Sequence, residues 1–101
     1  MELDFAKLSG FEWDAENSRK SLTKHHVSAR EAEEVFADSR LCILDDPTHS
    51  KNEPRWKVFG STTDARLLVV SFTVRGLNVR VISARPMNRR ERQVYEQKST
   101  S

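Results

Sequence analysis

The chain has 101 residues, of which 37% are hydrophobic and 32% are charged. This length predicts one domain with a modest core, and the balance of apolar and charged residues excludes a largely disordered protein. The longest uninterrupted apolar runs have four residues, as at 67–70, which is too short to cross a bilayer, and no signal-peptide pattern opens the sequence. We therefore expect a cytoplasmic protein with no membrane partner.

Charge is distributed unevenly, although the formal net charge is only +2. Acidic residues outnumber basic ones over residues 1–53, whereas residues 54–101 contain ten Lys or Arg and three carboxylates. Clustered positive charge raises the local potential and attracts phosphates. The second half of the chain therefore predicts a polyanionic partner. The single cysteine, Cys42, lies within an apolar run and is interpreted as a buried structural residue.

The first elements are polar and short. Residues 1–10 show no clear period and end in Ser-Gly, so we interpret them as a loose N-terminal extension to a single domain over residues 11–101. Residues 11–13 can form a short strand, and Asp14 is a suitable N-cap for a helix that runs to about residue 24.

A second helix has a stronger start signal. Ser28 and Glu31 have the spacing of a capping box, and Val27 and Ala32 stand at the positions of a hydrophobic staple. The buried stripe that follows ends before Asp38. Two short helices are thus predicted before the main strands of the sheet.

Four strand-like runs come next, and the segments between them are too short for crossover helices. They predict a four-stranded antiparallel meander. The runs cover residues 41–44, 55–59, 66–74 and 77–84.

The last two runs predict a hairpin that turns at residues 75–76. In this register Phe72 pairs with Val79 and Arg66 pairs with Arg85, so that one face of the hairpin forms the core. The opposite face is half polar, with Ser71, Thr73, Asn78 and Arg80. That face is the expected working surface.

A final helix begins with Asn88 as N-cap, and Glu91 completes a second capping-box spacing. Glu91 is expected to meet Arg85 or Arg66, and Tyr95 is expected in the core with a hydrogen-bonded hydroxyl. Together the elements predict an α+β fold with two N-terminal helices, a four-stranded antiparallel meander sheet and a C-terminal helix.

Several segments carry a family resemblance. They read FEWDAENSRKSLTKHHVS, EAEEVFAD, DDPTHS followed by E-x-R, and RVISARPMNRRERQVYE. Over residues 11–96 they closely resemble the BrnT toxins of bacterial type II toxin-antitoxin systems. The most specific parts are the F-E-W-D opening and the I-S-A-R and E-R-x-x-Y ending.

The resemblance implies a RelE-like ribonuclease fold and metal-free cleavage of RNA that slows growth, with no cofactor. It also implies a BrnA-like antitoxin with a ribbon-helix-helix part, and contact with operator DNA only through the toxin-antitoxin complex. Members often read W-D-x-x-K-x-x-x-N-x-x-K-H-G-V. This chain instead has Asn17, Ser21 and His26 where the family has Lys, Asn and Gly, so one cation of the family pattern is absent at position 17.

Metal-free cleavage requires proton transfer and stabilisation of extra negative charge on the phosphoryl oxygens. Arginine suits the second task because its planar fork grips two oxygens and stays charged. Arg85 and Arg80 are the first candidates, with Arg55 and Lys57 on a neighbouring strand. An ordinary surface ion pair is the alternative for each of them.

The proton-transfer group is left open among four residues. Glu53 precedes Arg55 by two positions and could share its face as a base. His25 is a candidate because histidine commonly transfers protons, but it stands at a helix end, where it can instead interact with the last carbonyls. His49 and Tyr95 complete the set.

The expected RNA contacts are Lys57, Arg89, Arg92 and Trp13, the last by stacking unless it mainly packs. No sequence pattern indicates a metal site, because neither the i, i+4 pairs nor the CxxC spacing of dedicated sites occurs. Asp45 and Asp46, before a proline, are read as a turn. The rival function is a non-catalytic module that binds RNA or an antitoxin.

Overall fold

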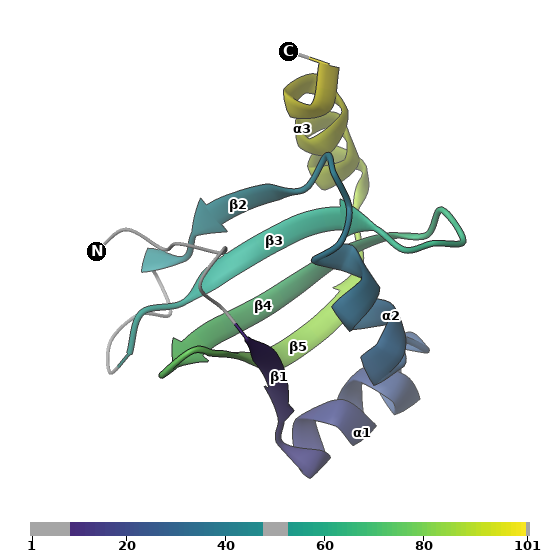
Figure 1. Ribbon diagram of the computed structural model, residues 1–101. Helices are drawn as coiled ribbons and strands as arrows, with labels where there is room; N and C mark the ends of the chain where they lie inside the picture. The colour runs from purple at the N-terminus through teal and green to yellow at the C-terminus, as the bar shows by residue number, and fades with distance from the viewer. Residues whose placement is uncertain (1–8, 48–52, 101) are drawn as a thin grey trace.

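The computed structural model describes residues 9–47 and 53–100. Within these residues, a five-stranded sheet of order β1-β5-β4-β3-β2 is packed against three helices (Figure 1). The elements are β1 (Gly10–Trp13), α1 (Ala15–His25), α2 (Ala29–Val35), β2 (Cys42–Asp45), β3 (Trp56–Ser61), β4 (Leu67–Arg75), β5 (Asn78–Pro86) and α3 (Arg89–Thr100).

Helix α1 begins and ends where local chemistry dictates. The Asp14 carboxylate accepts a hydrogen bond from the Glu16 N–H, as its predicted N-cap role requires. The helix ends at His26, whose φ of 55° lies in the left-handed region. Glycine adopts that conformation without steric cost, whereas in histidine the Cβ atom makes it sterically unfavourable.

The capping box of α2 is confirmed. The Glu31 N–H donates to the Ser28 hydroxyl oxygen at 3.1 Å, and the Ser28 N–H donates to the Glu31 carboxylate at 3.1 Å. Val27 and Ala32 are both fully buried, as the staple positions predict. These contacts turn the chain from α1 into α2 and lay both helices on the same face of the sheet (Figure 1).

The sheet is mixed, so the prediction of a purely antiparallel four-stranded meander was wrong. Strand β1 adds a fifth strand at the outer edge, where it pairs in parallel with β5 from Gly10 opposite Asn78 to Trp13 opposite Val81. The chain between β1 and β5 contains two helices and three strands, so it supplies the long connection that parallel pairing needs. Residues 1–8 of the predicted loose extension lie outside the described residues, while Gly10 belongs to β1.

The hairpin of β4 and β5 turns one residue later than the predicted turn at residues 75–76. Gly76 has a φ of 60° and serves the turn. Phe72 consequently pairs with Val81 rather than with Val79. The apolar residues of β4 still face the core, because a shift of two residues on β5 preserves the alternation of faces.

A β-bulge at Ile82 then changes which side chains face the core. The pairing of β4 with β5 shifts by one residue there, so that Arg85 lies opposite Val69, and the predicted pairing of Arg85 with Arg66 was wrong. One extra residue exchanges the two faces for everything that follows it. Ala84 therefore enters the core, fully buried, and Arg85 joins the opposite face.

The two faces of the sheet are covered to different extents. Helices α1 and α2 close one face over the main core, in which Val58, Val70 and Phe72 are fully buried. Helix α3 packs on the other face at one end only, where Tyr95 and Met87 meet a smaller apolar cluster that includes the buried Cys42. The helices and strands of residues 9–47 and 53–100 leave the rest of that face open.

Tyr95 has the packing role predicted for it. Its hydroxyl donates to the Asp38 carboxylate at 2.7 Å, and burial together with this hydrogen bond raises the pKa of Tyr95 to about 12. The side chain is 7% exposed. No helix among the described residues is long and apolar enough to cross a membrane.

Candidate phosphate-binding site

Polar side chains occupy the face of the sheet that α3 leaves open. Lys57 on β3 lies opposite Ser71 on β4, and Ser71 lies opposite Ser83 on β5. Side chains of directly opposed residues point to the same face, so these three form a polar row across the centre of the sheet. Arg55 precedes Lys57 by two residues and therefore extends the polar surface along β3.

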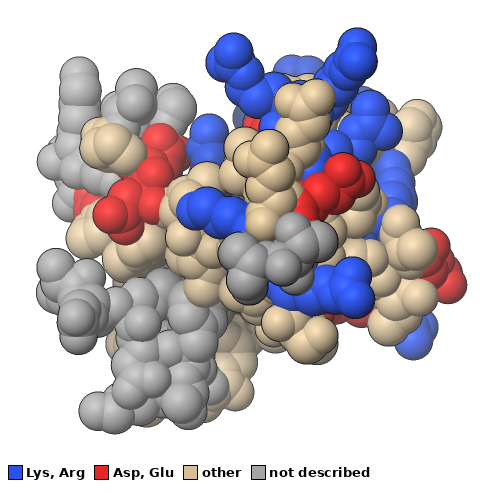
Figure 2. Space-filling view, turned by 90° about the horizontal axis from the view of Figure 1, so that it is seen from above, with Lys and Arg blue, Asp and Glu red and all other residues tan. Residues whose placement is uncertain are grey.

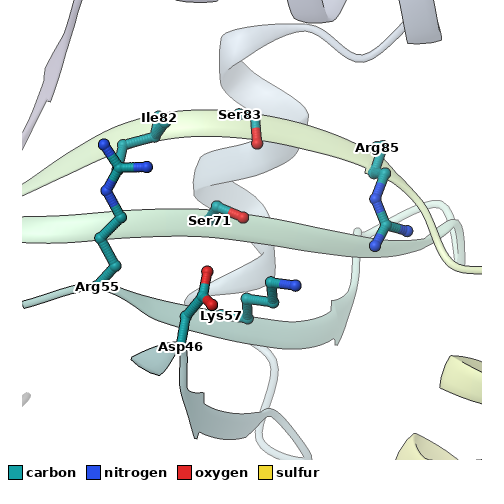
Figure 3. A pocket seen from close by; sticks show the side chains of 7 residues that line it. All are labelled: Asp46, Arg55, Lys57, Ser71, Ile82, Ser83 and Arg85. Carbon is teal, nitrogen blue, oxygen red and sulfur yellow. The ribbon is translucent and has the colours of Figure 1, made fainter. Parts of the chain in front are cut away.

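The row borders a hollow of about 180 Å³ (Figure 3). This volume is several times the ~30 Å³ that one water molecule occupies in the liquid, so the hollow can admit a phosphate group. Its lining comes from four strands or their immediate continuations and consists of Asp46, Arg55, Lys57, Ser71, Ile82, Ser83 and Arg85.

Arg85 is held at the edge of the hollow by the start of α3. Its Nη1 and Nη2 atoms each donate to one carboxylate oxygen of Glu91 at 2.7 Å. These hydrogen bonds lower the pKa of Glu91 and raise that of Arg85. Glu91 also accepts from the Asn88 N–H at 2.9 Å, so the capping box of α3 and the orientation of Arg85 depend on one carboxylate.

The ion pair with Glu91 leaves some N–H donors of Arg85 available. Three hydrogen bonds of the Arg85 guanidinium go to described residues, two to Glu91 and one to the Pro86 carbonyl. A guanidinium has five N–H donors, and its side chain is 35% exposed. Donors therefore remain for an oxygen bound in the hollow.

The lining is positively charged on balance. Arg55, Lys57 and Arg85 contribute three cations, against the single carboxylate of Asp46 within the lining. Glu91 stands behind Arg85, and Lys57 also lowers its pKa. A concave surface with excess positive charge concentrates anions. Two serine hydroxyls add donors that can orient a bound oxyanion.

Helix α3 and its surroundings extend the positive charge beyond the hollow. Seen from the side on which α3 stands, Lys and Arg side chains gather mainly in the upper and right parts of the view, with a few carboxylates among them (Figure 2). The predicted RNA contacts Arg89 and Arg92 are exposed residues of α3. Neither lines the hollow, and both are free to meet a longer polyanion that passes it.

Two predicted site residues lie on strands or loops but outside the hollow. Arg80 approaches Glu12 and Asp14 at 3.7 Å each, beside the edge strand β1. Glu53 approaches Arg75 at 3.7 Å near the β4–β5 turn. The structure therefore does not bring Glu53 or Arg80 together with Arg85.

Two further predicted site residues, His25 and Trp13, lie on the closed side of the sheet. His25 ends α1, and its carbonyl accepts a hydrogen bond from Arg66 Nη2 at 3.1 Å. Trp13 packs against the main core and donates through Nε1 to the Glu33 carboxylate at 3.0 Å. The sheet separates both residues from the hollow. The further candidate His49 lies outside the described residues.

Asp46 and Ser83 were not predicted at the site, whereas Ser71 lies on the polar face that was expected to be the working surface. Asp46 was read as part of a turn, although its N–H donates to the Arg55 carbonyl at 2.9 Å and so continues the pairing of β2 with β3. The sequence signal for Asp46 is the acidic end of β2, which lies next to the basic start of β3 when the two strands pair. Among the described residues, no group of three or more His, Cys, Asp or Glu side chains is placed to hold a metal ion.

The fold and the hollow together define an α+β protein with a cationic depression on the open face of its sheet, and such a surface attracts anions. The family model "Ribonuclease toxin, BrnT, of type II toxin-antitoxin system" matches residues 13–91. The chain therefore belongs to the BrnT family of ribonuclease toxins. The matched range contains all the described residues that line the hollow.

A solved structure supports the fold. The crystal structure of the Brucella abortus ribonuclease toxin BrnT aligns with a TM-score of 0.60 over 79% of this chain and 97% of that chain, at 22% sequence identity. At this identity the likeness shows the fold alone. No curated protein matches the chain in sequence.

Proposed function

We propose that this chain is a metal-independent endoribonuclease toxin that cleaves RNA by attack of a ribose 2′-hydroxyl on the adjacent phosphorus. The observation that carries the proposal is the convergence of Arg55, Lys57 and Arg85 with two serine hydroxyls on one hollow. The family to which the chain belongs supplies the class of reaction.

The lining residues suit the negative charge that develops during this reaction. In the transition state the two non-bridging oxygens carry more charge than in the substrate, and preorganised donors stabilise that increase. Arg85 presents donors in a fixed plane, while Lys57 offers a compact charge on the neighbouring side of the hollow. Ser71 and Ser83 can donate to the same oxygens.

Arg89 and Arg92 are assigned to the RNA strand on either side of the cleaved linkage. They are exposed on α3 and contribute to the positive surface around it. Arg80, Glu53, His25 and Trp13 have no direct part in the proposed reaction, because none of them lines the hollow.

The direct test is RNA cleavage by the purified protein in the presence of EDTA. The proposal predicts chelator-resistant cleavage that leaves 2′,3′-cyclic phosphate ends, and a loss of at least ~10²-fold in Arg85→Ala, as for removal of other oxyanion-stabilising donors. Arg75→Ala is the matched control, since Arg75 is an exposed arginine at the hairpin end whose partner is Glu53. Binding without cleavage would instead identify a non-catalytic RNA-binding module.

The partner is proposed to be a BrnA-like ribbon-helix-helix antitoxin, because the family belongs to type II toxin-antitoxin systems. Expression of the chain alone is expected to arrest growth. Coexpression of a ribbon-helix-helix protein encoded beside it is expected to restore growth and to yield a copurifying complex. Growth arrest that persists despite coexpression of that protein contradicts this part of the proposal.

A further inference from the structure

We propose that Asp46 is the group that takes the proton from the attacking 2′-hydroxyl. This inference rests on the proposed ribonuclease function and adds a catalytic residue to it. The position directly after β2 places the carboxylate among the cations that would hold the phosphate.

The pairing of β2 with β3 fixes the position of Asp46. Asp45 lies opposite Trp56, and the Asp46 N–H donates to the Arg55 carbonyl at 2.9 Å, so the antiparallel ladder continues by one residue. Asp46 therefore stands across from Arg55, and their side chains share the open face. Asp45 belongs to the opposite face, with Trp56.

The carboxylate is enclosed and directed into the hollow. Asp46 is only 7% exposed, and Figure 3 shows its carboxylate pointing into the space between Arg55 and Lys57, below Ser71. A carboxylate in this position can face a ribose hydroxyl whose phosphate is held by the surrounding cations. Among the described residues that line the hollow, it is the only carboxylate or imidazole.

The proposed step conserves atoms and charge. The 2′-oxygen forms a bond to phosphorus, the 2′-hydroxyl proton moves to an Asp46 carboxylate oxygen, and the bond from phosphorus to the 5′-oxygen breaks. The leaving 5′-oxygen takes a proton from a solvent water, and Asp46 then releases its proton to solvent. The products are a 2′,3′-cyclic phosphate and a 5′-hydroxyl end.

The test compares cleavage with binding in Asp46→Asn. Asparagine preserves size and hydrogen bonding but is a poor proton acceptor, so the cleavage rate is expected to fall by about 10²- to 10⁴-fold. Affinity for an RNA of the same sequence with 2′-O-methyl groups is expected to be unchanged or tighter, because a negative charge leaves a cationic hollow. Asp45→Asn, on the other face, is the matched control and retains full cleavage.

The outcomes separate this inference from the proposed function. A wild-type protein that produces no cyclic phosphate ends contradicts the proposed function itself. If the wild-type protein cleaves RNA and Asp46→Asn cleaves within tenfold of it, only the role of Asp46 is overturned. Parallel losses of cleavage and of affinity in Asp46→Asn also overturn it, since they indicate that Asp46 merely positions Arg55.

A second pair of variants covers the case in which Asp46→Asn unfolds at the assay temperature. Asp46→Glu and Asp46→Gln have side chains of equal size and differ in whether they accept a proton. Measurable cleavage by Asp46→Glu, with a loss of at least tenfold further in Asp46→Gln at equal melting temperature, supports the inference. Equal cleavage by the two variants contradicts it.

Discussion

The two faces of the central sheet use the same three strands for opposite purposes. On the face below α1 and α2, residues of β3, β4 and β5 such as Val58, Phe72 and Val81 are buried in a continuous apolar core. On the other face, their immediate neighbours include Lys57, Ser71 and Arg80, and the described apolar cluster of that face lies at the end that α3 covers. The alternation of side chains along a strand permits this division.

In this fold, the residues that stabilise the sheet and the residues that line the hollow lie on opposite faces. The closed face buries enough apolar surface to hold the strands in place, so the open face can carry charged side chains that contribute little to folding. Substitutions on adjacent residues of one strand are therefore expected to affect different properties. The predictions below compare the faces in this way, in order of decreasing effect.

The largest effect is expected from Phe72→Ala on the closed face. Phe72 is fully buried and its ring stacks on Trp56, with centroids 5.8 Å apart. Removing a buried phenylalanine side chain costs about 3 to 5 kcal/mol, measurable by urea unfolding. Ser71→Ala, one residue away on the open face, is expected to change stability by less than ~0.5 kcal/mol while it weakens RNA binding. Similar unfolding free energies for the two variants would contradict the division of roles.

An intermediate effect is expected from salt on RNA affinity, which tests the open face. Each phosphate contact to single-stranded RNA contributes a log–log slope of about −0.7, so three cations predict a slope near −2 or steeper. Raising salt fourfold is then expected to weaken binding by roughly 20-fold. Lys57→Ala is expected to make the slope shallower by ~0.7, whereas Arg75→Ala leaves it unchanged. A flat salt response would exclude a polyanion site here.

A smaller effect on stability is expected from Glu91→Gln, which weakens the ion pair between Glu91 on α3 and Arg85 on the open face. Arg85 lowers the pKa of Glu91 in the folded state. The ion pair therefore stabilises the protein fully at pH values above the usual glutamate pKa of 4.5. This contribution to the unfolding free energy is lost as the pH falls through the lowered pKa. Since Arg85 is 35% exposed, we expect a loss of about 1 kcal/mol at pH 7 and little difference at acid pH.

Urea unfolding of both proteins across pH measures this difference. Glu16→Gln is the control, because Glu16 pairs with Lys20 on the exposed surface of α1 at 3.5 Å. A Glu91→Gln penalty that grows as the pH falls would show that the sign of this linkage is wrong.

The smallest effect is an increase in stability from His26→Gly on the closed side. Glycine relieves the left-handed conformation of His26, at a cost of greater freedom in the unfolded chain, so the net gain is about 0.5 kcal/mol. The backbone carbonyl that accepts from Arg66 is retained. His25→Gly, at the last residue of α1, is expected to destabilise by less than ~1 kcal/mol, and RNA cleavage is expected to survive in both variants. A lower melting temperature for His26→Gly would contradict the strain argument.

Local features of this fold could be predicted from the sequence because they depend on residues a few positions apart. The capping boxes at Ser28 and Asn88 are of this kind, and so is the contact of Glu91 with an arginine, for which Arg85 and Arg66 were the two candidates and Arg85 is the observed partner. The BrnT resemblance stated from the motifs agrees with the family match over residues 13–91.

Long-range features could not be predicted in the same way. The parallel pairing of β1 with β5 joins residues more than 60 positions apart, and nothing in the short β1 segment indicates its partner or direction. The bulge adds one residue without a glycine or proline to mark it. Asp46 was missed for a related reason, since its role depends on the alignment of β2 with β3 across a long connection.

The bulge at Ile82 has a genetic consequence. Loss of that single codon would restore regular pairing between β4 and β5 and would aim the Arg85 side chain toward the apolar interior, while Ala84 would move to the exposed side. A three-nucleotide deletion keeps the reading frame and every charged residue. It is nevertheless expected to abolish RNA cleavage as completely as a truncation does. Cells that escape a toxic copy of this gene are a natural place to find it.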